Sequence, residues 1–468
     1  MSRTTRAIAI AASISSASLA AADPTSWHGT VAGDVAFTDN VFAAPSSGNR
    51  EVDVFFTVRP GVLFGYAHPR TMQDFTVELE AIEYVRHSDE PSLSARVGWR
   101  SFYLTGPRSQ VMTQVNAQSG LLAAIASRSA ASDTVPELIP VNKVNVYQAD
   151  ASEYLSYVAT RELSLSQTLF GRASYTDDNL MDPTTTTAAE VGIGLGIDRQ
   201  FQDNSLSLEL GGSVVHLERI APEGALQGSR RDRQLNPRIR GQWRHDFTRS
   251  ISGSVDGGLV YVHPFGTDPF NPDVETKDGL FPIVGAQGSY TEVWGRAGLQ
   301  VRRDVTPNLF VAQNTVNDSA TASVVMPLPW LDDSRRRAPR MIGLGSLGVQ
   351  RTQLIDVETG STASDFRSVR VDLGVAYAPR PGFIYGLRYE LSYQTGDQEA
   401  AMAIPGYYRN TIYFTYSIQY PDRTSPETPR RRSNAVRADR KDLVPLGAEP
   451  VVPDIVEQGS EGEEEGER

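Results

Sequence analysis

The stretch FIYGLRYELSYQ, residues 383–394, alternates large apolar side chains with polar or small ones at every second position. Successive side chains of a β-strand point to opposite faces, so this period of two predicts a strand with one apolar and one polar face. The same alternation recurs in residues 190–198, 368–377 and 411–420. It extends from Trp27 to Tyr420, which predicts a body built from strands.

A soluble β-sandwich would show the same alternation, so the length of the strands and the spacing of their connections decide the class. Several predicted strands keep phase for longer than the ~5–6 residues usual in soluble proteins. Short connections at 67–70, 105–108, 202–204, 248–249 and 378–381 alternate with long ones at 39–50, 127–143, 219–232, 264–280 and 356–365. Short turns at one end and long loops at the other are typical of a barrel that crosses a membrane with its strands.

Aromatic residues also gather at the predicted strand ends, as the two interfaces of a membrane favour: Trp27, Phe37, Tyr66, Trp99, Tyr103, Trp243, Tyr261, Tyr377, Tyr393 and Tyr420. An unpaired backbone group costs several kcal/mol in hydrocarbon, so such a sheet must close on itself. Eighteen strands are predicted, near 27–38, 51–66, 72–86, 92–104, 109–122, 145–158, 162–176, 187–201, 205–217, 233–247, 250–263, 281–290, 293–303, 318–327, 340–355, 366–378, 383–395 and 407–420. Sixteen is the alternative, because residues 281–327 are poorly patterned.

The composition of the chain excludes several further classes of protein. The chain has 468 residues, a formal net charge of −12 and no Cys. These values exclude a disulfide scaffold and thiol chemistry and argue against a nucleic-acid binder. The mean hydropathy is −0.31, and no apolar run approaches the ~18 residues that a membrane-spanning helix needs.

The two ends of the chain differ from the body. Residues 1–22 begin with Arg3 and Arg6, continue with a short apolar stretch and end in alanines, which predicts a secretory signal peptide rather than a buried helix. Residues 421–468 contain 8 basic and 12 acidic side chains and no aromatic ones. This tail is expected to stay disordered, either simply solvated or as a docking strip for a partner.

Motifs that suggest chemistry have simpler explanations here. Residues 343–348 match G-x-G-x-x-G, but the alternation continues through them and no helix pattern follows. The histidines are scattered without metal-ligand spacing, and no G-x-S-x-G occurs. The loop residues Asp268, Asp273 and Asp278 could bind calcium, but an ordinary polar loop explains them better. We therefore expect no catalytic residue, no cofactor and no metal, and we do not expect an enzyme.

Charged side chains fall on the polar face of many predicted strands. The residues expected to line the inside of the barrel are Arg96, Arg100, Arg238, Arg240, Arg244, Arg296, Arg370, Asp372, Arg388 and Glu390. In a water-filled interior, such arginines would attract anions and hydrogen-bond sugar hydroxyls. The alternative is that they form structural ion pairs along the wall, and the sequence leaves both open.

Short motifs resemble a known family. The sequence Thr38-Asp39-Asn40 at the end of the first predicted strand resembles the "TDN" signature of outer-membrane β-barrel porins, some of which accompany exopolysaccharide or capsule export. Residues 59–61 and residues 379–382 look similar to that family too, and the closing segment 410–420 resembles the barrel-assembly signal, in which alternating apolar residues end in an aromatic one. The resemblance implies a pore that is unplugged or constricted by a loop, paired in some cases with a periplasmic export protein.

We therefore predict a signal peptide (1–22), an all-β transmembrane antiparallel β-barrel of about eighteen strands (23–420) and a disordered, charged periplasmic tail (421–468). The expected function is a porin-type channel in the outer membrane of a Gram-negative bacterium, with saccharide or polysaccharide passage as its specific version. The alternatives are a general diffusion porin and a non-conducting structural or surface-binding barrel. Expected partners are outer-membrane lipid, the barrel assembly machinery and, through the tail, a periplasmic polysaccharide-export protein, but no nucleic acid. An even strand count would place both ends of the barrel in the periplasm.

Overall fold

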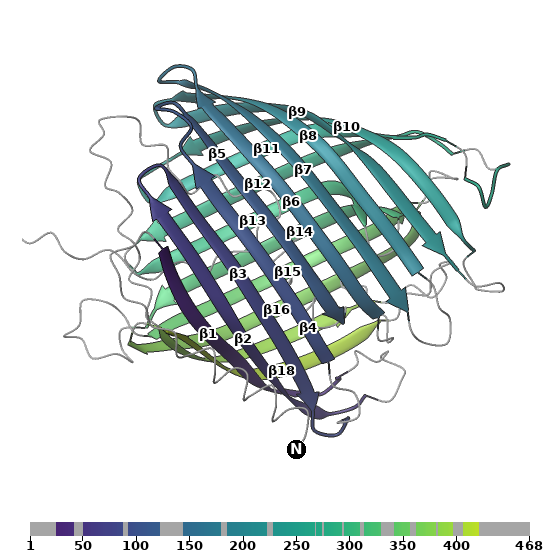
Figure 1. The fold of residues 1–468 in the computed structure, drawn as a ribbon. Helices are drawn as coiled ribbons and strands as arrows, with labels where there is room; N and C mark the ends of the chain where they lie inside the picture. The colour runs from purple at the N-terminus through teal and green to yellow at the C-terminus, as the bar shows by residue number, and fades with distance from the viewer. Residues whose placement is uncertain are drawn as a thin grey trace, which may run out of the picture.

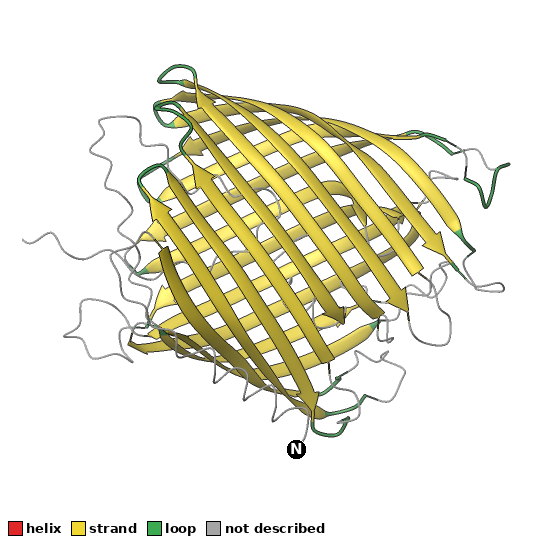
Figure 2. Cartoon of the chain, in the orientation of Figure 1, coloured by secondary structure: helices red, strands yellow, loops and turns green. Residues whose placement is uncertain are grey.

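The protein is described from a computed structural model, which covers residues 25–41, 50–87, 92–121, 144–178, 185–221, 228–266, 268–273, 276–292, 294–308, 313–328, 341–355, 362–380, 382–395 and 406–420. These residues form strands joined by turns and loops (Figure 2). The strands are β1 (Thr25–Thr38), β2 (Asp53–His68), β3 (Thr71–Tyr84), β4 (Ser92–Tyr103), β5 (Ser109–Leu121), β6 (Val144–Val158), β7 (Leu163–Asp178), β8 (Thr185–Phe201), β9 (Asn204–Ile220), β10 (Arg230–Asp246), β11 (Ile251–Pro264), β12 (Gly279–Glu292), β13 (Gly295–Asn308), β14 (Gln313–Pro327), β15 (Met341–Ile355), β16 (Thr362–Arg380), β17 (Phe383–Gln394) and β18 (Tyr407–Tyr420). The signal peptide and the charged tail predicted from the sequence lie outside the described residues.

The eighteen strands form one closed antiparallel barrel. Each strand pairs with its neighbours in the chain, and β1 pairs with β18 from Gly29–Tyr420 to Thr38–Thr411, which closes the sheet. Figure 1 shows the strands tilted against the barrel axis, as closure of a sheet requires. The predicted class and the count of eighteen, rather than sixteen, are confirmed.

The two ends of the barrel differ in their connections. The turns at 69–70, 202–203, 293–294 and 381–382 lie at the end where β1 begins and β18 ends, here called the short-turn end. The connections of 39–52, 122–143, 265–278 and 395–406 lie at the opposite, long-loop end. The 13-residue connection 328–340 between β14 and β15 departs from this rule, because it lies at the short-turn end.

Alternation along the strands gives the barrel an apolar outside and a polar inside. On β8, Val191 and Leu195 are 67% and 56% exposed on the outside, while Glu190 faces inward and is buried. Glycines alternate with these apolar residues and lie on the inner face. A soluble protein would cover so much apolar surface, so the outer face is suited to lipid. Charged residues also occur at outward positions, among them Glu153 on β6 and the Arg303–Asp318 and Arg351–Asp365 ion pairs of β13–β16.

The wall splits at the long-loop end between β12 and β13. Their pairing stops at Val284–Arg303, whereas β12 continues to pair with β11 up to Gly279 and β13 with β14 up to Asn308. Beyond the split, the ends of β13–β15 lie inside the ends of β10–β12. The Asn314 side-chain amide of β14 donates to Gln234 Oε1 of β10 over 2.7 Å, although three strands separate them in the sheet.

Apolar packing accompanies this overlap. Val260, Val262 and Ile283 lie at inward positions of β11 and β12, and they form one buried cluster with three residues at outward positions of the next strands: Val305, Val316 and Ile355. The inner face of one part of the wall therefore packs against the outer face of another. Both faces of residues 314–317 are buried here. The alternation consequently fades, and the predicted segments 293–303 and 318–327 are each five residues too short at the long-loop end.

Candidate functional site

All ten residues predicted to line a channel occupy inward positions in the strand register, on the face opposite the exposed apolar side chains. They come from separate parts of the wall: Arg96 and Arg100 on β4, Arg238, Arg240 and Arg244 on β10, Arg296 on β13, Arg370 and Asp372 on β16, and Arg388 and Glu390 on β17. The structure gathers four of them into one cluster and distributes the other six along the barrel.

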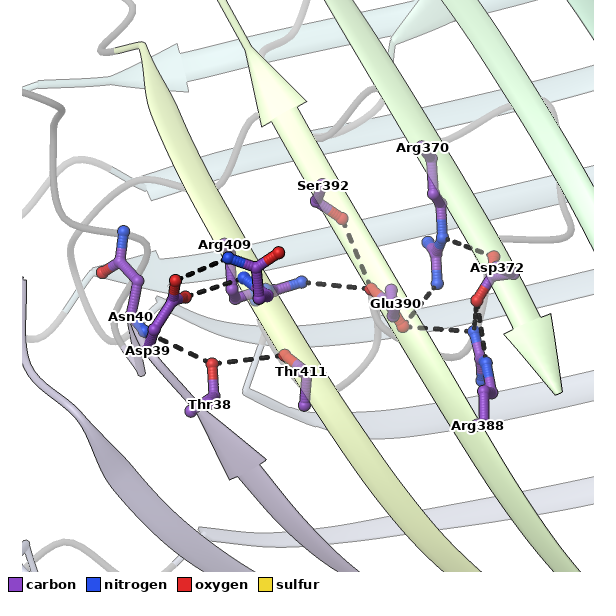
Figure 3. Close-up of polar contacts among 11 residues, drawn as sticks. Thr38, Asp39, Asn40, Arg370, Asp372, Arg388, Glu390, Ser392, Arg409 and Thr411 are labelled. Atoms are coloured by element: carbon purple, nitrogen blue, oxygen red, sulfur yellow. Dashed lines mark hydrogen bonds and ion pairs between the residues drawn. The ribbon is translucent and has the colours of Figure 1, made fainter.

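The ionic cluster is centred on Glu390, whose side chain is almost fully buried (Figure 3). Arg370 Nη2 and Arg388 Nη2 lie 3.0 and 3.1 Å from its Oε2, and Arg409 Nη2 lies 3.5 Å from its Oε1. Ser392 donates its hydroxyl to the same carboxylate over 3.4 Å. A carboxylate taken out of water needs such partners, because its burial alone would cost several kcal/mol.

Asp372 completes the ionic cluster. It accepts hydrogen bonds from Arg370 Nε over 3.1 Å and from Arg388 Nε over 2.8 Å. Among the residues that the structure describes, the cluster therefore holds three guanidinium groups, those of Arg370, Arg388 and Arg409, and two carboxylates, those of Asp372 and Glu390. Arg409, on β18, is a charged member of the cluster that was absent from the predicted residues. It shares the inward face with Thr411, so the alternation that identified the others also contains it.

The arginines of β10 are paired along the wall. Arg238 donates to Glu209 of β9 over 2.7 Å, and Arg240 to Asp256 of β11 over 3.0 Å. Arg244 Nε lies 3.5 Å from a carboxylate oxygen of Asp246. These three arginines thus occupy inward positions in the strand register and form ion pairs along the wall. Inward position and pairing are compatible in a wide, hydrated interior.

The three remaining residues lie apart from these groups. Arg96 on β4 is opposite Glu78 of β3. Arg100 and Arg296 are exposed, and among the residues that the structure describes no carboxylate lies within ion-pair distance of either side chain. They present charge to solvent inside the barrel without a fixed acidic partner in that part of the chain.

A second charged group lies on the other side of the junction between β18 and β1. Arg59 of β2 donates to Asp34 of β1 and lies 3.6 Å from Glu80 of β3. Both carboxylates are buried. Residues 59–61 resemble a known family in sequence, and these ion pairs show that Arg59 also holds two buried carboxylates of the wall.

The Thr38-Asp39-Asn40 motif joins the first strand to the last. Asp39 accepts two bonds of 2.7 Å from the backbone N–H and side-chain amide of Asn410, and Asn40 Nδ2 donates to the Tyr408 carbonyl over 3.0 Å. On the inner face, Thr411 donates to Thr38 over 3.2 Å. We call Thr38, Asp39, Asn40, Asn410 and Thr411 the seam clamp; Figure 3 shows its relation to the ionic cluster.

The G-x-G-x-x-G match at residues 343–348 lies within a strand of the barrel wall. Residues 343–348 continue strand β15 without a helix after them. Within the described ranges, no group of three or more His, Asp or Glu side chains is arranged to hold a metal ion. No helix in the part of the chain that the structure covers has the length and apolarity to span a bilayer.

No family model matches the chain, and no curated protein matches it. Among solved structures, it is similar to the alcaligin outer-membrane receptor FauA of Bordetella pertussis, with 10% identity and a TM-score of 0.45 over 84% of this chain and 76% of that one. OccAB3 of Acinetobacter baumannii has 9% identity and a TM-score of 0.45 over 85% and 99% of the two chains. OccK2 of Pseudomonas aeruginosa has 9% identity and a TM-score of 0.42 over 85% and 98%.

Proposed function

We propose that the protein is a porin-like channel of the outer membrane. The observation that carries the proposal is the sorting of side chains by a closed eighteen-stranded sheet: the outer face is apolar, whereas the inner face carries arginines and carboxylates. The ion-paired inner wall would be costly in a dry core but not around water. A barrel of this strand number is wide enough to enclose an aqueous lumen.

Saccharides are the cargo that this wall suits best. Its arginines are donors only and its carboxylates are acceptors only, and they are paired along β9–β11 and β16–β18. Such pairs largely cancel each other's field, so strong selectivity for small ions is not expected. They still offer alternating donors and acceptors, which match the hydroxyl groups of a sugar. This reasoning supports saccharide or polysaccharide passage, in line with the resemblance of residues 38–40 to barrels associated with export.

The orientation follows from the connections. Short turns face the periplasm in outer-membrane barrels, so we place both ends of the barrel there. Residues 421–468 would then extend into the periplasm, where a polysaccharide-export protein could bind them. Pull-down of periplasmic proteins with the full chain and with a chain ending at residue 420 tests this part separately.

A liposome-swelling assay tests the proposed function. Vesicles that contain the folded protein should swell in solutions of small sugars, with rates that fall as the sugar becomes larger. Arg240→Glu should keep the swelling and shift ion selectivity toward cations, because it replaces a neutral pair with two negative charges. Swelling no faster than in protein-free vesicles would contradict the channel and favour a non-conducting barrel.

A further inference from the structure

Three aromatic side chains form a row on the inner wall beside the ionic cluster. Tyr413 of β18 is opposite Ala36 of β1, Ala36 is opposite Phe55 of β2, and Phe55 is opposite Tyr84 of β3. All four positions face inward, on the side of Thr38 and Asp53. We call Phe55, Tyr84 and Tyr413 the aromatic row.

The rings contact one another across the junction of the first and last strands. The Phe55 ring centroid lies 5.7 Å from that of Tyr84 and 6.2 Å from that of Tyr413, with interplanar angles of 53° and 79°. Ala36 lies between Phe55 and Tyr413 in the strand register and is fully buried. Because its side chain is small, the Phe55 and Tyr413 rings contact each other over it. The row therefore spans four strands as one apolar surface inside an otherwise polar wall.

Charged groups border the row on both sides. Arg388 is directly opposite Tyr413, with its guanidinium carbon 5.4 Å from the ring centroid, and it connects the row to the ionic cluster. Toward the short-turn end, the next inward residue of β1 is Asp34, while Arg59 and Glu80 lie two inward positions from Phe55 and Tyr84, beyond Thr57 and Ile82. Arg388 is 39% exposed, against 13% for Arg370 and 10% for Arg409, so it is the arginine best placed to reach a solute.

This arrangement has the two elements that a pyranose ring requires. The faces of such a ring carry C–H groups that pack on aromatic side chains, and its edge carries hydroxyls that bind guanidinium and carboxylate groups. The charges of the ionic cluster nearly balance, which favours a neutral polyol over a small anion. Mutual packing of three rings explains their contact but not their position between two charged groups on the inner wall.

We infer that the aromatic row and Arg388, with Asp372 behind it, form a saccharide-binding subsite on the inner wall. A pyranose chain would place its C–H faces against Phe55, Tyr84 and Tyr413 and its hydroxyls toward Arg388 and Asp372. The inference rests on the proposed function, because it requires a lumen that solutes enter. It adds a place where a saccharide pauses on its way through the barrel.

Calorimetric titration of the detergent-solubilised full-length mature protein with maltohexaose tests the subsite without requiring conduction. Wild-type protein should bind, and Phe55→Ala and Tyr413→Ala should each bind at least tenfold more weakly. The matched control is Phe414→Ala, which removes an aromatic side chain exposed on the outer face of the same strand and should leave binding unchanged. Arg388→Gln shortens the side chain and removes its charge, should also weaken maltohexaose binding, and serves if an aromatic variant fails to fold.

Titration with trigalacturonate separates the two kinds of recognition. An affinity well above that for maltohexaose, lost in Arg388→Gln but kept in Phe55→Ala, would mean that the site recognises an anion and would overturn the inference. Absence of maltohexaose binding in wild-type protein would overturn it as well. Conduction with no sugar binding would leave the channel intact and refute only the subsite, whereas sugar binding without conduction would refute the channel.

Discussion

The barrel has two unusual junctions, and they are built in opposite ways. β18 and β1 are not connected in the chain, yet they pair over ten residue positions and carry the seam clamp at their long-loop end. β12 and β13 are separated by only two residues in the chain, yet their pairing stops at Val284–Arg303. The two junctions pair over similar lengths, ten positions between β1 and β18 and nine between β12 and β13, and they differ in what holds their long-loop ends.

The difference follows from what each junction would lose by opening. A gap between β1 and β18 would expose two edges of the sheet along the whole wall, where each unpaired backbone group costs several kcal/mol in lipid. Side-chain bonds at the end of that junction therefore oppose fraying. The β12–β13 pair is held by its turn, and the overlap of its free ends covers the edges with apolar contacts and with the Gln234–Asn314 bond.

The largest expected effect is obtained by locking the overlap. The chain has no cysteine, so the double variant Gln234→Cys and Asn314→Cys introduces the only pair of thiols. A cross-link over this separation of 80 residues should stabilise the folded barrel by about 4 kcal/mol relative to its reduced form. Urea titration on unheated gels measures the shift. Failure of the thiols to react even with a short bifunctional reagent would show that the two strand ends do not overlap.

Breaking the seam clamp should lower the free energy of unfolding by nearly as much as the cross-link raises it. Asp39→Ala removes the acceptor of two bonds from Asn410, each worth about 1.5–3 kcal/mol for a charged group, so we expect a loss of about 3 kcal/mol. The matched control is Asp318→Ala on the outer face of β14, which removes one partly exposed ion pair of 3.5 Å and should cost at most about 1 kcal/mol. Equal losses in the two variants would remove the special role assigned to the Thr38-Asp39-Asn40 motif.

Smaller changes in stability show whether the overlapping ends of β10–β12 and β13–β15 are held mainly by the Gln234–Asn314 hydrogen bond or by apolar packing. Asn314→Ala leaves the buried Gln234 side chain without this donor and should destabilise the barrel by about 2 kcal/mol. The double variant Gln234→Leu and Asn314→Leu replaces both partners by apolar groups and should cost less than Asn314→Ala, with the remaining loss coming from the bond that Gln234 Nε2 donates to the buried Asp232. A double variant as damaged as the single one would contradict an overlap stabilised chiefly by apolar contact.

The smallest effect depends on pH and concerns His87, which follows β3 and contacts Asp53 at the start of β2. A hydrogen bond to Asp53 raises the pKa of His87, with a further contribution from Glu51. Because the folded state favours the charged imidazole, its stabilising contribution is complete below the ordinary pKa of about 6.5 and is lost as pH rises through the raised value. Folded stability of His87→Gln should lack this dependence, whereas a wild-type contribution that grows with rising pH would contradict the assignment.

The fold could be predicted from the sequence because one face of nearly every strand meets an environment unlike that of the other. Where this holds, as in β17 and β18, the predicted ends differ from the observed ones by a residue at most. Where it fails, at the ends of β13 and β14, both faces are buried and the alternation carries too little information. Which strands overlap there depends on contacts between residues 80 positions apart, such as Gln234 and Asn314, and no local pattern reports them.

The inner wall was predictable in part for the same reason. Alternation placed Arg370, Asp372, Arg388 and Glu390 on one face, but it could not show that three guanidinium groups surround one carboxylate. That arrangement requires the register between β16, β17 and β18. The aromatic row requires the pairing of β18 with β1, which joins opposite ends of the chain. Contacts across this junction are therefore the least visible in the sequence and the most informative in the structure.

Single-channel recording in planar lipid bilayers tests the central claim most directly. Protein shown to be folded by its gel mobility should insert and produce discrete, uniform current steps whose size rises with salt concentration. Folded, membrane-inserted protein that produces no steps under any salt or voltage would contradict a water-filled lumen inside the barrel.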